Sequence, residues 1–368
     1  MPTPQAPVSF ARTSDGQRLA YSRCGHGPTV IQAATWMGHL EHTEDSPMAG
    51  ALARGLARQH SVVRYDQRGC GLSELCAASP SLEGWVHELE TVVDAATPVL
   101  SATSGAPRIA LLGISQGAAT AIAYAARHPE RVSRLVLHGG YARGRLVRDP
   151  SRETAEEANT LARMAEIGWG RADEAFRQIF TTQIIPTGTR QQQRRFNEMQ
   201  RHAASPEVAA GLLRAFDRLD VSALLPLVRC PTLVLHSRDD PRVPFDEGRY
   251  LAAGLPDAEF VSIASANHLL LEDEPAWPRW LAHVREFLAA DATERNRAQV
   301  WSLLTQRQRG LTELMAQGLD NGQIAASLGL SGKTVRNHIT AIFGKLSVEN
   351  RSQAIVRLRD SGFGAARV

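Results

Sequence analysis

Long apolar runs are missing from this sequence. It contains no stretch of about 18 apolar residues, which excludes a transmembrane helix of ordinary length. Residues 1–16 also lack a basic region followed by an apolar core, so we expect no secretory signal. The sequence therefore predicts a cytoplasmic protein that does not bind membranes.

Cysteine is scarce, and its spacing is not that of a zinc site. Scattered thiols of this kind argue for reduced side chains and against a disulfide framework or structural zinc. We expect neither a metal nor another cofactor. The four cysteines are Cys24, Cys70, Cys76 and Cys230.

Lysine is absent before residue 301, and positive charge is concentrated beyond it. Residues 301–368 contain nine basic and four acidic residues, a net charge of +5, whereas residues 1–300 carry −2. A small basic segment on a near-neutral body indicates a polyanion-binding module. The 368 residues, 43% hydrophobic and 21% charged, have a globular composition and allow two or three domains.

Short apolar segments alternate with helical patterns over the first 290 residues. This alternation is typical of an α/β fold, a mostly parallel sheet with helices on both faces. Asp15-Gly16 lies between the first two segments and predicts a hairpin. The predicted strands are 8–12, 17–21, 29–33, 61–65, 108–112, 134–138, 232–236 and 259–263.

The strand pattern disappears between residues 141 and 229. Amphipathic segments there predict several helices inserted between two strands, and an insertion of this size usually forms a cap. Residues 291–300 are polar and weakly patterned, so we expect a linker or connecting helix there. The predicted domains are 1–290, with the cap, and 301–368.

A Gly-x-Ser-x-Gly motif centred on Ser115 lies between a predicted strand and a strong helix former. In such a tight turn the serine is held exposed in a strained geometry, and it needs an adjacent base to act as a nucleophile. Two later segments supply partners in the order Ser, Asp, His. Asp239 and Asp240 follow one predicted strand, and His268 follows the last one.

These motifs resemble the α/β-hydrolase family over residues 8–290. The resemblance implies that Ser115 is the nucleophile, His268 the general base and Asp240 the acid that orients it, with Asp239 as the competing acid. It also implies an oxyanion hole made by the backbone N–H groups of Gln116 and Trp36. Here the sequence departs from the family, because Ala-Thr-Trp replaces the usual His-Gly.

Several other residues have simpler interpretations. His39 and His42 have a metal-like spacing but no further ligands, so we expect them in a loop or pocket wall. Asp66 and Arg68 are expected to stabilise their loop. Six aromatic residues could line a pocket under the cap, but we expect most of them in its core: Trp85, Trp169, Phe176, Phe180, Phe196 and Phe216.

Residues 305–364 carry a helix-turn-helix pattern. Thr305 caps a first helix, residues 321–328 form a second, and Ser331 caps a third after a turn at Gly329. The third helix has one apolar stripe, Val335, Ile339, Ile342 and Leu346, and a polar opposite face. Such a helix fits the major groove of DNA, although a helical protein-interaction module is the alternative.

This segment closely resembles the LuxR/GerE-type DNA-binding domain. The resemblance implies that Arg336, Asn337 and Thr340 face base edges of double-stranded DNA. It places near phosphates the side chains of Lys333, Thr334, His338 and Lys345. Residues 352–358 resemble the fourth helix, which often forms the dimer seam, so a homodimer is expected.

Together the two halves predict a one-component transcription regulator. Its hydrolase-fold domain would bind a small molecule, and the ligand would change DNA affinity if it prefers one regulatory state. The alternative is an active carboxylic-ester hydrolase, with the DNA-binding domain as a targeting module. A third possibility is slow hydrolysis of the signal that resets the switch. A further alternative is that the chain keeps the hydrolase fold but has lost catalytic activity.

Overall fold

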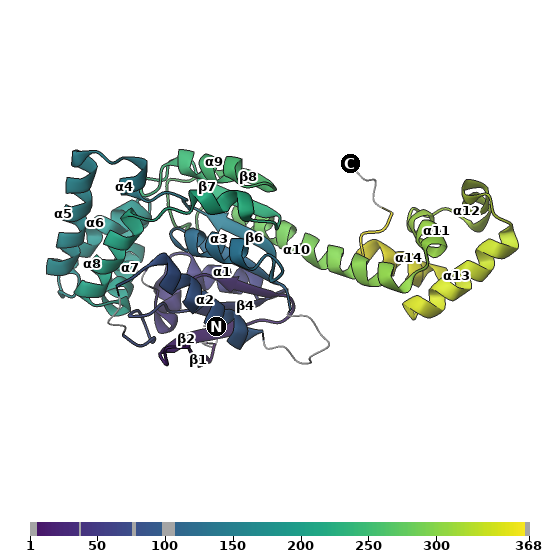
Figure 1. Ribbon diagram of the computed structural model, residues 1–368, viewed down its shortest axis with the longest axis horizontal. Helices are drawn as coiled ribbons and strands as arrows, with labels where there is room; N and C mark the ends of the chain where they lie inside the picture. The colour runs from purple at the N-terminus through teal and green to yellow at the C-terminus, as the bar shows by residue number, and fades with distance from the viewer. Residues whose placement is uncertain (1–5, 37, 76–78, 98–106, 365–368) are drawn as a thin grey trace. The chain divides into compact units, whose positions relative to one another are not determined.

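The computed structural model describes residues 6–36, 38–75, 79–97 and 107–364. The chain forms two compact units, residues 1–285 and 286–368. The division falls inside helix α10 (Ala276–Leu303; Figure 1), five residues before the expected end of the first domain at residue 290. Residues 291–300, expected as a linker or connecting helix, lie within α10. The first turns of α10 belong to the first unit because Arg285 donates a 2.6 Å hydrogen bond to the Gly55 carbonyl.

An eight-stranded sheet forms the centre of the first unit, in the order β1-β2-β4-β3-β5-β6-β7-β8. Strands β1 (Val8–Arg12) and β2 (Arg18–Cys24) form the predicted hairpin, and β2 pairs antiparallel with β4. The remaining pairings are parallel. The parallel strands are β3 (Thr29–Gln32), β4 (Ser61–Tyr65), β5 (Ile109–Ile114), β6 (Val132–His138), β7 (Thr232–Ser237) and β8 (Ala258–Ile263).

Helices cover this sheet and bury its central strands. Every residue of β5, β6 and β7 is buried, as expected for parallel strands covered on both faces. The α/β fold predicted from the alternation is therefore confirmed. The covering helices are α1 (Ala49–Leu56) on β4, α2 (Leu82–Ala96) on β1 and β2, α3 (Gly117–Arg127) on β5 and β6, and α9 (Phe245–Gly254) on β7 and β8.

A group of helices lies between β6 and β7 in the sequence, and we call it the cap (Figure 1). Its aromatic side chains form a packed interior: the ring of Trp169 lies 5.4 Å from that of Phe180, and Trp36 packs against both. The cap elements are α4 (Arg145–Arg148), α5 (Arg152–Gly168), α6 (Ala175–Ile184), α7 (Arg190–Ala203), α8 (Pro206–Asp217) and the 3-10 helix η2 (Ser222–Leu227).

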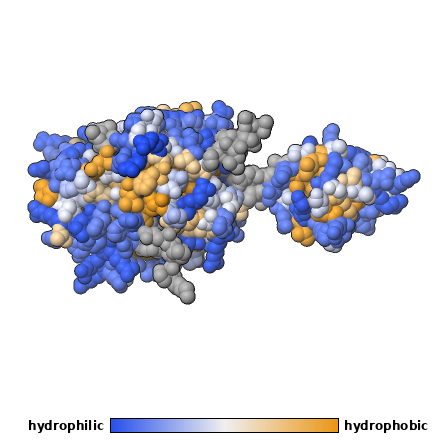
Figure 2. Space-filling view, turned by 90° about the horizontal axis from the view of Figure 1, so that it is seen from below, coloured by the Kyte–Doolittle hydropathy of each residue, from blue (hydrophilic) through white to orange (hydrophobic). Residues whose placement is uncertain are grey.

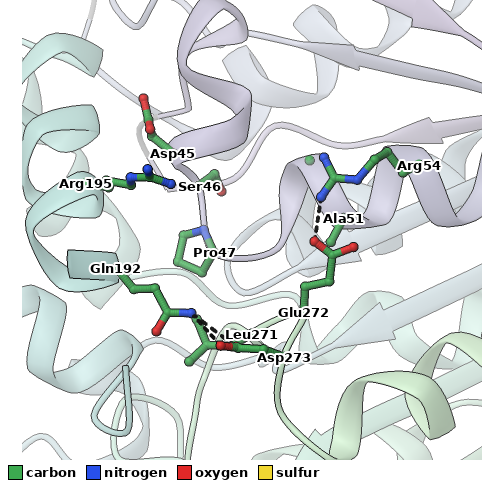
Figure 3. Close-up of a pocket in the computed structure, with 11 residues that line it drawn as sticks. Asp45, Ser46, Pro47, Ala51, Arg54, Gln192, Arg195, Leu271, Glu272 and Asp273 are labelled. Atoms are coloured by element: carbon green, nitrogen blue, oxygen red, sulfur yellow. Dashed lines mark hydrogen bonds and ion pairs between the residues drawn. The ribbon is translucent and has the colours of Figure 1, made fainter. Parts of the chain in front are cut away.

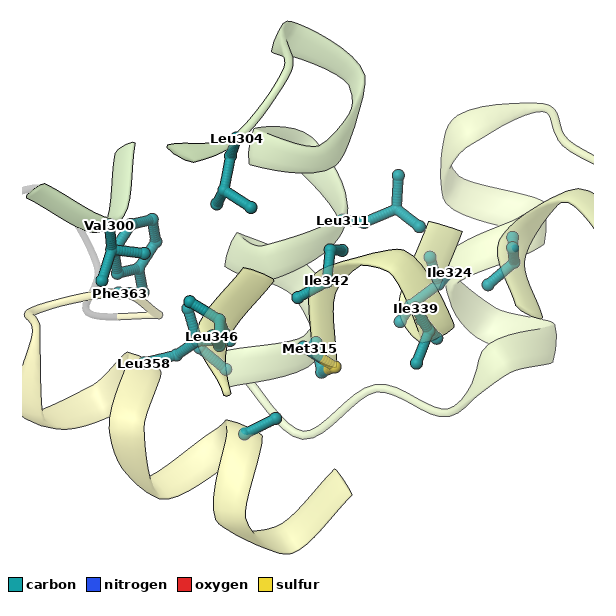
Figure 4. Close-up of a cluster of buried hydrophobic side chains, with 13 residues drawn as sticks. Val300, Leu304, Leu311, Met315, Ile324, Ile339, Ile342, Leu346, Leu358 and Phe363 are labelled. Atoms are coloured by element: carbon teal, nitrogen blue, oxygen red, sulfur yellow. The ribbon is translucent and has the colours of Figure 1, made fainter. Parts of the chain in front are cut away.

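The second unit is all-helical beyond α10, as predicted, with one apolar core (Figure 4). Its helices are capped by the predicted residues, because Thr305 accepts a hydrogen bond from Gln308 N–H and Ser331 accepts one from Thr334 N–H. Gly329 makes the turn at φ 62°. The four helices are α11 (Gln306–Ala316), α12 (Asn321–Leu328), α13 (Gly332–Leu346) and α14 (Arg351–Asp360).

The surface is mostly hydrophilic, with apolar side chains in separate patches on the face seen in Figure 2. Within the described ranges, no helix has the length and apolarity needed to cross a membrane. Three of the cysteines are unpaired thiols, Cys24, Cys70 and Cys230, whereas Cys76 lies outside the described residues.

Candidate functional site

Ser115 occupies a tight turn between β5 and α3. Its φ of 54° lies in the left-handed region, which non-glycine residues seldom adopt, and its N–H donates to the His138 carbonyl at 2.9 Å. The flanking glycines permit the turn: a Cβ at Gly113 would lie 2.6 Å from Ala118 Cα, and one at Gly117 would lie 2.9 Å from Ala34 O. The motif thus has the strained strand-to-helix geometry predicted from the sequence.

Asp240 and His268 meet beyond the ends of β7 and β8. His268 Nδ1 donates to Asp240 Oδ2 at 2.7 Å, and both side chains are buried. The other oxygen, Oδ1, accepts from the N–H groups of Arg242 and Val243 at 2.8 and 3.0 Å. Asp239, the competing acid, is exposed and makes no such contact with His268.

This arrangement keeps the carboxylate of Asp240 ionised. Burial alone would raise its pKa, but the His268 imidazole, its hydrogen bond and the Val243 N–H together lower the pKa below the usual value. With Nδ1–H given to Asp240, the other nitrogen of neutral His268 is an acceptor. His268 Nε2 is buried and makes no hydrogen bond to any described residue, so it is free to take a proton.

His138 holds the backbone of His268 in place, a role that the sequence did not indicate. Its Nε2–H donates to the His268 carbonyl at 3.0 Å, while Nδ1 accepts from the indole N–H of Trp280 on α10 at 3.1 Å. Burial, followed by repulsion from His268 and His236, lowers the pKa of His138 to about 3. His138 is therefore neutral at ordinary pH, in the tautomer that these two hydrogen bonds require.

The two residues expected to form an oxyanion hole lie beside Ser115. Neither the Gln116 nor the Trp36 N–H donates a hydrogen bond within the described chain. Thr35 Oγ1 donates to Ile114 O at 3.0 Å and ties this loop to the nucleophile turn. The indole of Trp36, which replaces the family's histidine or glycine, packs into the cap and donates to Gln200 Oε1 at 3.3 Å.

Ser115 and His268 line one small cavity beneath the cap. Its volume is about 20 Å³, which leaves room for about one water molecule. A larger ligand therefore requires the cap or the loop beneath it to move. The lining residues are Thr35, Trp36, Ser115, Gln116, Tyr141, Ile184, Phe216, Arg242, His268 and Leu269.

A larger pocket of about 440 Å³ lies nearby, between α1, α7 and the loop after His268 (Figure 3). One contact across it joins the cap to the sheet domain, because Gln192 Nε2 donates to Asp273 at 3.1 Å (Figure 3). A second contact, between Arg54 and Glu272 at 2.6 Å, joins α1 to the loop after His268. The cap also holds the loop that carries His268 directly, because His268 N–H donates to the Ile184 carbonyl at 2.9 Å. The pocket itself lacks Ser115 and His268.

The residues expected to have structural roles, His39, His42, Asp66 and Arg68, contact other parts of the sheet domain or the cap. The ring centroid of His42 lies 4.8 Å from that of His39 and 4.9 Å from that of His202. In the described ranges, no three or more His, Cys, Asp or Glu side chains come together to hold a metal ion. Asp66 accepts from two backbone N–H groups of its own and a neighbouring loop, and burial raises its pKa to about 7. Arg68 pairs with Asp15 at 2.7 Å.

Helix α13 presents the residues expected to contact DNA. Val335 and the three later members of its apolar stripe are buried in the core (Figure 4). The side chains of Lys333, Arg336, Asn337, Thr340 and Lys345 are exposed, and those of Thr334 and His338 are partly exposed. The helix therefore offers one polar face to solvent, with four cationic or potentially cationic groups and three groups able to pair with base edges.

Comparisons with known proteins agree with both units. The family model described as alpha/beta hydrolase fold matches residues 43–275, and that described as bacterial regulatory proteins, luxR family, matches residues 302–358. A pimeloyl-[acyl-carrier protein] methyl ester esterase of Chromobacterium violaceum is 26% identical over 72% of this chain and 93% of its own length. The spore germination protein GerE of Bacillus subtilis is 48% identical over 16% of this chain and 81% of its own length.

Solved structures show the same fold for the first unit. An esterase from Exiguobacterium antarcticum superposes with a TM-score of 0.65 at 18% identity, covering 76% of this chain and 99% of that one. A thermophilic esterase from Thermogutta terrifontis superposes with a TM-score of 0.62 at 23% identity, covering 78% of this chain and 99% of that one. At these identities the likeness establishes fold alone. The chain belongs to the α/β-hydrolase family and carries a C-terminal luxR-family helix-turn-helix domain.

Proposed function

We propose that this protein is a one-component transcription regulator whose hydrolase-fold domain binds an acyl compound at Ser115. The observation that carries the proposal is the 2.7 Å Asp240–His268 hydrogen bond beside a strained Ser115, in a chain that also has a luxR-family domain. A buried base with a free Nε2 is the arrangement that activates a serine hydroxyl.

The same groups would also catalyse ester hydrolysis. Ser115 Oγ would attack the acyl carbonyl while His268 Nε2 takes the hydroxyl proton, and the N–H groups of Gln116 and Trp36 would stabilise the oxyanion. Collapse would expel the alcohol, which takes the proton from His268, and leave an acyl ester on Ser115. A water molecule, deprotonated by His268, would then release the acid and restore the serine.

The DNA half of the proposal depends on α13. Arg336, Asn337 and Thr340 would contact base edges, since they share its exposed face. Phosphates would be bound by Lys333, Thr334, His338 and Lys345, which sets the register on the duplex and makes binding salt-dependent. A homodimer joined through α14 would place its half-sites about one helical turn apart.

The second candidate is an ester hydrolase that uses the DNA-binding domain for targeting. The complete acid–base pair favours it, because binding alone does not require a buried Asp240 on His268. Slow hydrolysis that resets a regulator is the intermediate case. Ser115→Ala separates them: ligand-dependent DNA binding that survives this change shows that recognition, not turnover, carries the signal.

Labelling by a fluorophosphonate tests the reactive serine in either case. We expect covalent labelling of the full chain and none after Ser115→Ala. Asp240→Asn should slow labelling by about 10²–10⁴-fold, because His268 loses the carboxylate that fixes its tautomer. Asp239→Asn, at the exposed neighbouring position, is the matched control and should leave the rate unchanged. An unlabelled native chain would reject both the enzyme and the reset mechanism.

A further inference from the structure

Arg242 is the cationic side chain of the cavity that holds Ser115 and His268. Its backbone N–H serves Asp240, but its guanidinium extends to a different neighbour, donating from Nη1 to Gln183 Oε1 of cap helix α6 at 3.0 Å. The guanidinium carbon also lies 5.8 Å from the centre of the Trp36 ring. The side chain thus lies between Trp36, in the loop after β3, and the cap helix α6.

This guanidinium forms no salt bridge with any residue in the described ranges. No described carboxylate lies within 4.0 Å of its nitrogens. Arg143, by contrast, pairs with Glu247 at 2.5 Å. Arg242 is partly buried, and its guanidinium, which donates to the neutral amide of Gln183, can accept an anionic partner beside Ser115.

The surrounding charges favour an anion at this position. Arg145 and Arg148 lie on the same side of the cap, and the nearby Asp217 is shared with Arg145 at 3.7 Å. Asp240 is committed to His268. Burial, and then repulsion from Arg145, lower the pKa of Arg242, so an added negative charge would stabilise the guanidinium.

Arg242 also lines an outer groove of about 800 Å³, together with Arg145, Arg148 and Gln183. It is the residue common to this groove and to the closed cavity. An anion that entered from the groove would reach Arg242 first. It could replace the neutral Gln183 oxygen as the partner of the guanidinium, since a charge-assisted hydrogen bond is the stronger one.

We propose that the ligand of this cavity is an acyl compound that also carries a carboxylate, with the carboxylate bound by Arg242 and the acyl carbon at Ser115. This inference rests on the proposed function of Ser115 and adds the chemical class of the ligand. A paired carboxylate would take two hydrogen bonds from the planar guanidinium, which an uncharged acyl chain cannot accept.

A matched pair of chromogenic esters tests this assignment. Mono-p-nitrophenyl succinate and p-nitrophenyl butyrate have acyl chains of equal length, but only the first carries a carboxylate. We expect the native chain to have the higher kcat/KM on the succinate ester. Arg242→Met should lower the ratio of the two kcat/KM values, succinate ester over butyrate ester, by about 10–100-fold, because only the succinate ester loses a charge-assisted hydrogen bond. Arg249→Met, an exposed arginine on α9, is the control for net charge.

A binding measurement covers the case of a receptor without turnover. In the Ser115→Ala chain, succinate should raise the melting temperature and its uncharged analogue succinamide should not. Arg242→Met in the same background should abolish the shift, whereas Arg249→Met should retain it.

The outcomes separate this inference from the function on which it rests. A native chain that is neither labelled by fluorophosphonate nor active on either ester, and that is not stabilised by succinate, would overturn both. A labelled chain with equal activity on the two esters would overturn the carboxylate assignment alone. Equal losses on both esters in Arg242→Met would also overturn it, because Arg242 would then serve the reaction itself.

Discussion

The expected role of each residue in this site depends on its hydrogen-bond partners as well as on its own side chain. Asp240 differs from the adjacent Asp239 in burial and in its 2.7 Å contact with His268. His138 is fixed from both sides, by the Trp280 indole and the His268 carbonyl. Each motif could be predicted from the sequence because its own residues are adjacent in the chain, as in the Gly-x-Ser-x-Gly motif around Ser115. His138 could not, because its partner Trp280 lies 142 residues away.

The neutral state of His138 makes stability depend on pH. Its folded pKa is about 3, well below the value near 6.5 of an unfolded histidine, so below pH 6.5 the unfolded chain binds a proton that the folded chain excludes. The free energy of unfolding should therefore fall by about 1.4 kcal/mol between pH 7.5 and 5.5 from this residue. His138→Gln should lose that part of the dependence in chemical denaturation, and His26→Gln, at an exposed position, should retain it. An unchanged pH dependence in His138→Gln would contradict the assignment.

Whole elements were predicted well where a local pattern determines them. The strand-to-helix turn at Ser115, the hairpin at Gly16 and the capped helices α11 and α13 follow from glycines, caps and apolar periodicity. The small size of the cavity at Ser115 could not be predicted from the sequence. It depends on how the cap packs on the sheet domain, as in the contact of Trp36 with Gln200, 164 residues apart. Distant contacts of this kind leave no periodic signal in the sequence.

The proposed function assigns base contacts and phosphate contacts to different side chains of α13, and two variants distinguish them. Arg336→Ala should cost about 1–3 kcal/mol of specific binding and relax the preference at one base pair. Lys333→Ala should weaken binding on all sequences alike and reduce the salt slope by about 1. Both side chains are exposed, so neither change should alter folding. The measurement is fluorescence anisotropy with a selected duplex and a scrambled one at several salt concentrations. An equal loss from Arg336→Ala on both duplexes would contradict base readout.

At the scale of the whole molecule, one helix is shared by the two units. The N-terminal part of α10 carries Trp280, which supports His138 beneath the loop that carries His268, and its C-terminal part contributes Val300 to the core of the second unit. A ligand that moves the cap must disturb the contacts of the cap with His268. Such a change alters DNA affinity only if the ligand binds one DNA-binding state better than another.

The central claim, that occupancy at Ser115 controls DNA binding, has a direct measurement. The affinity of the full chain for a duplex selected from a random library is compared before and after stoichiometric phosphonylation, with the identically treated Ser115→Ala chain as the control. We expect phosphonylation to change the affinity of the native chain by at least about fivefold, the lower end of ordinary allosteric coupling, and to leave the variant unchanged. Equal affinity for DNA in the free and the fully phosphonylated native chain would contradict the claim.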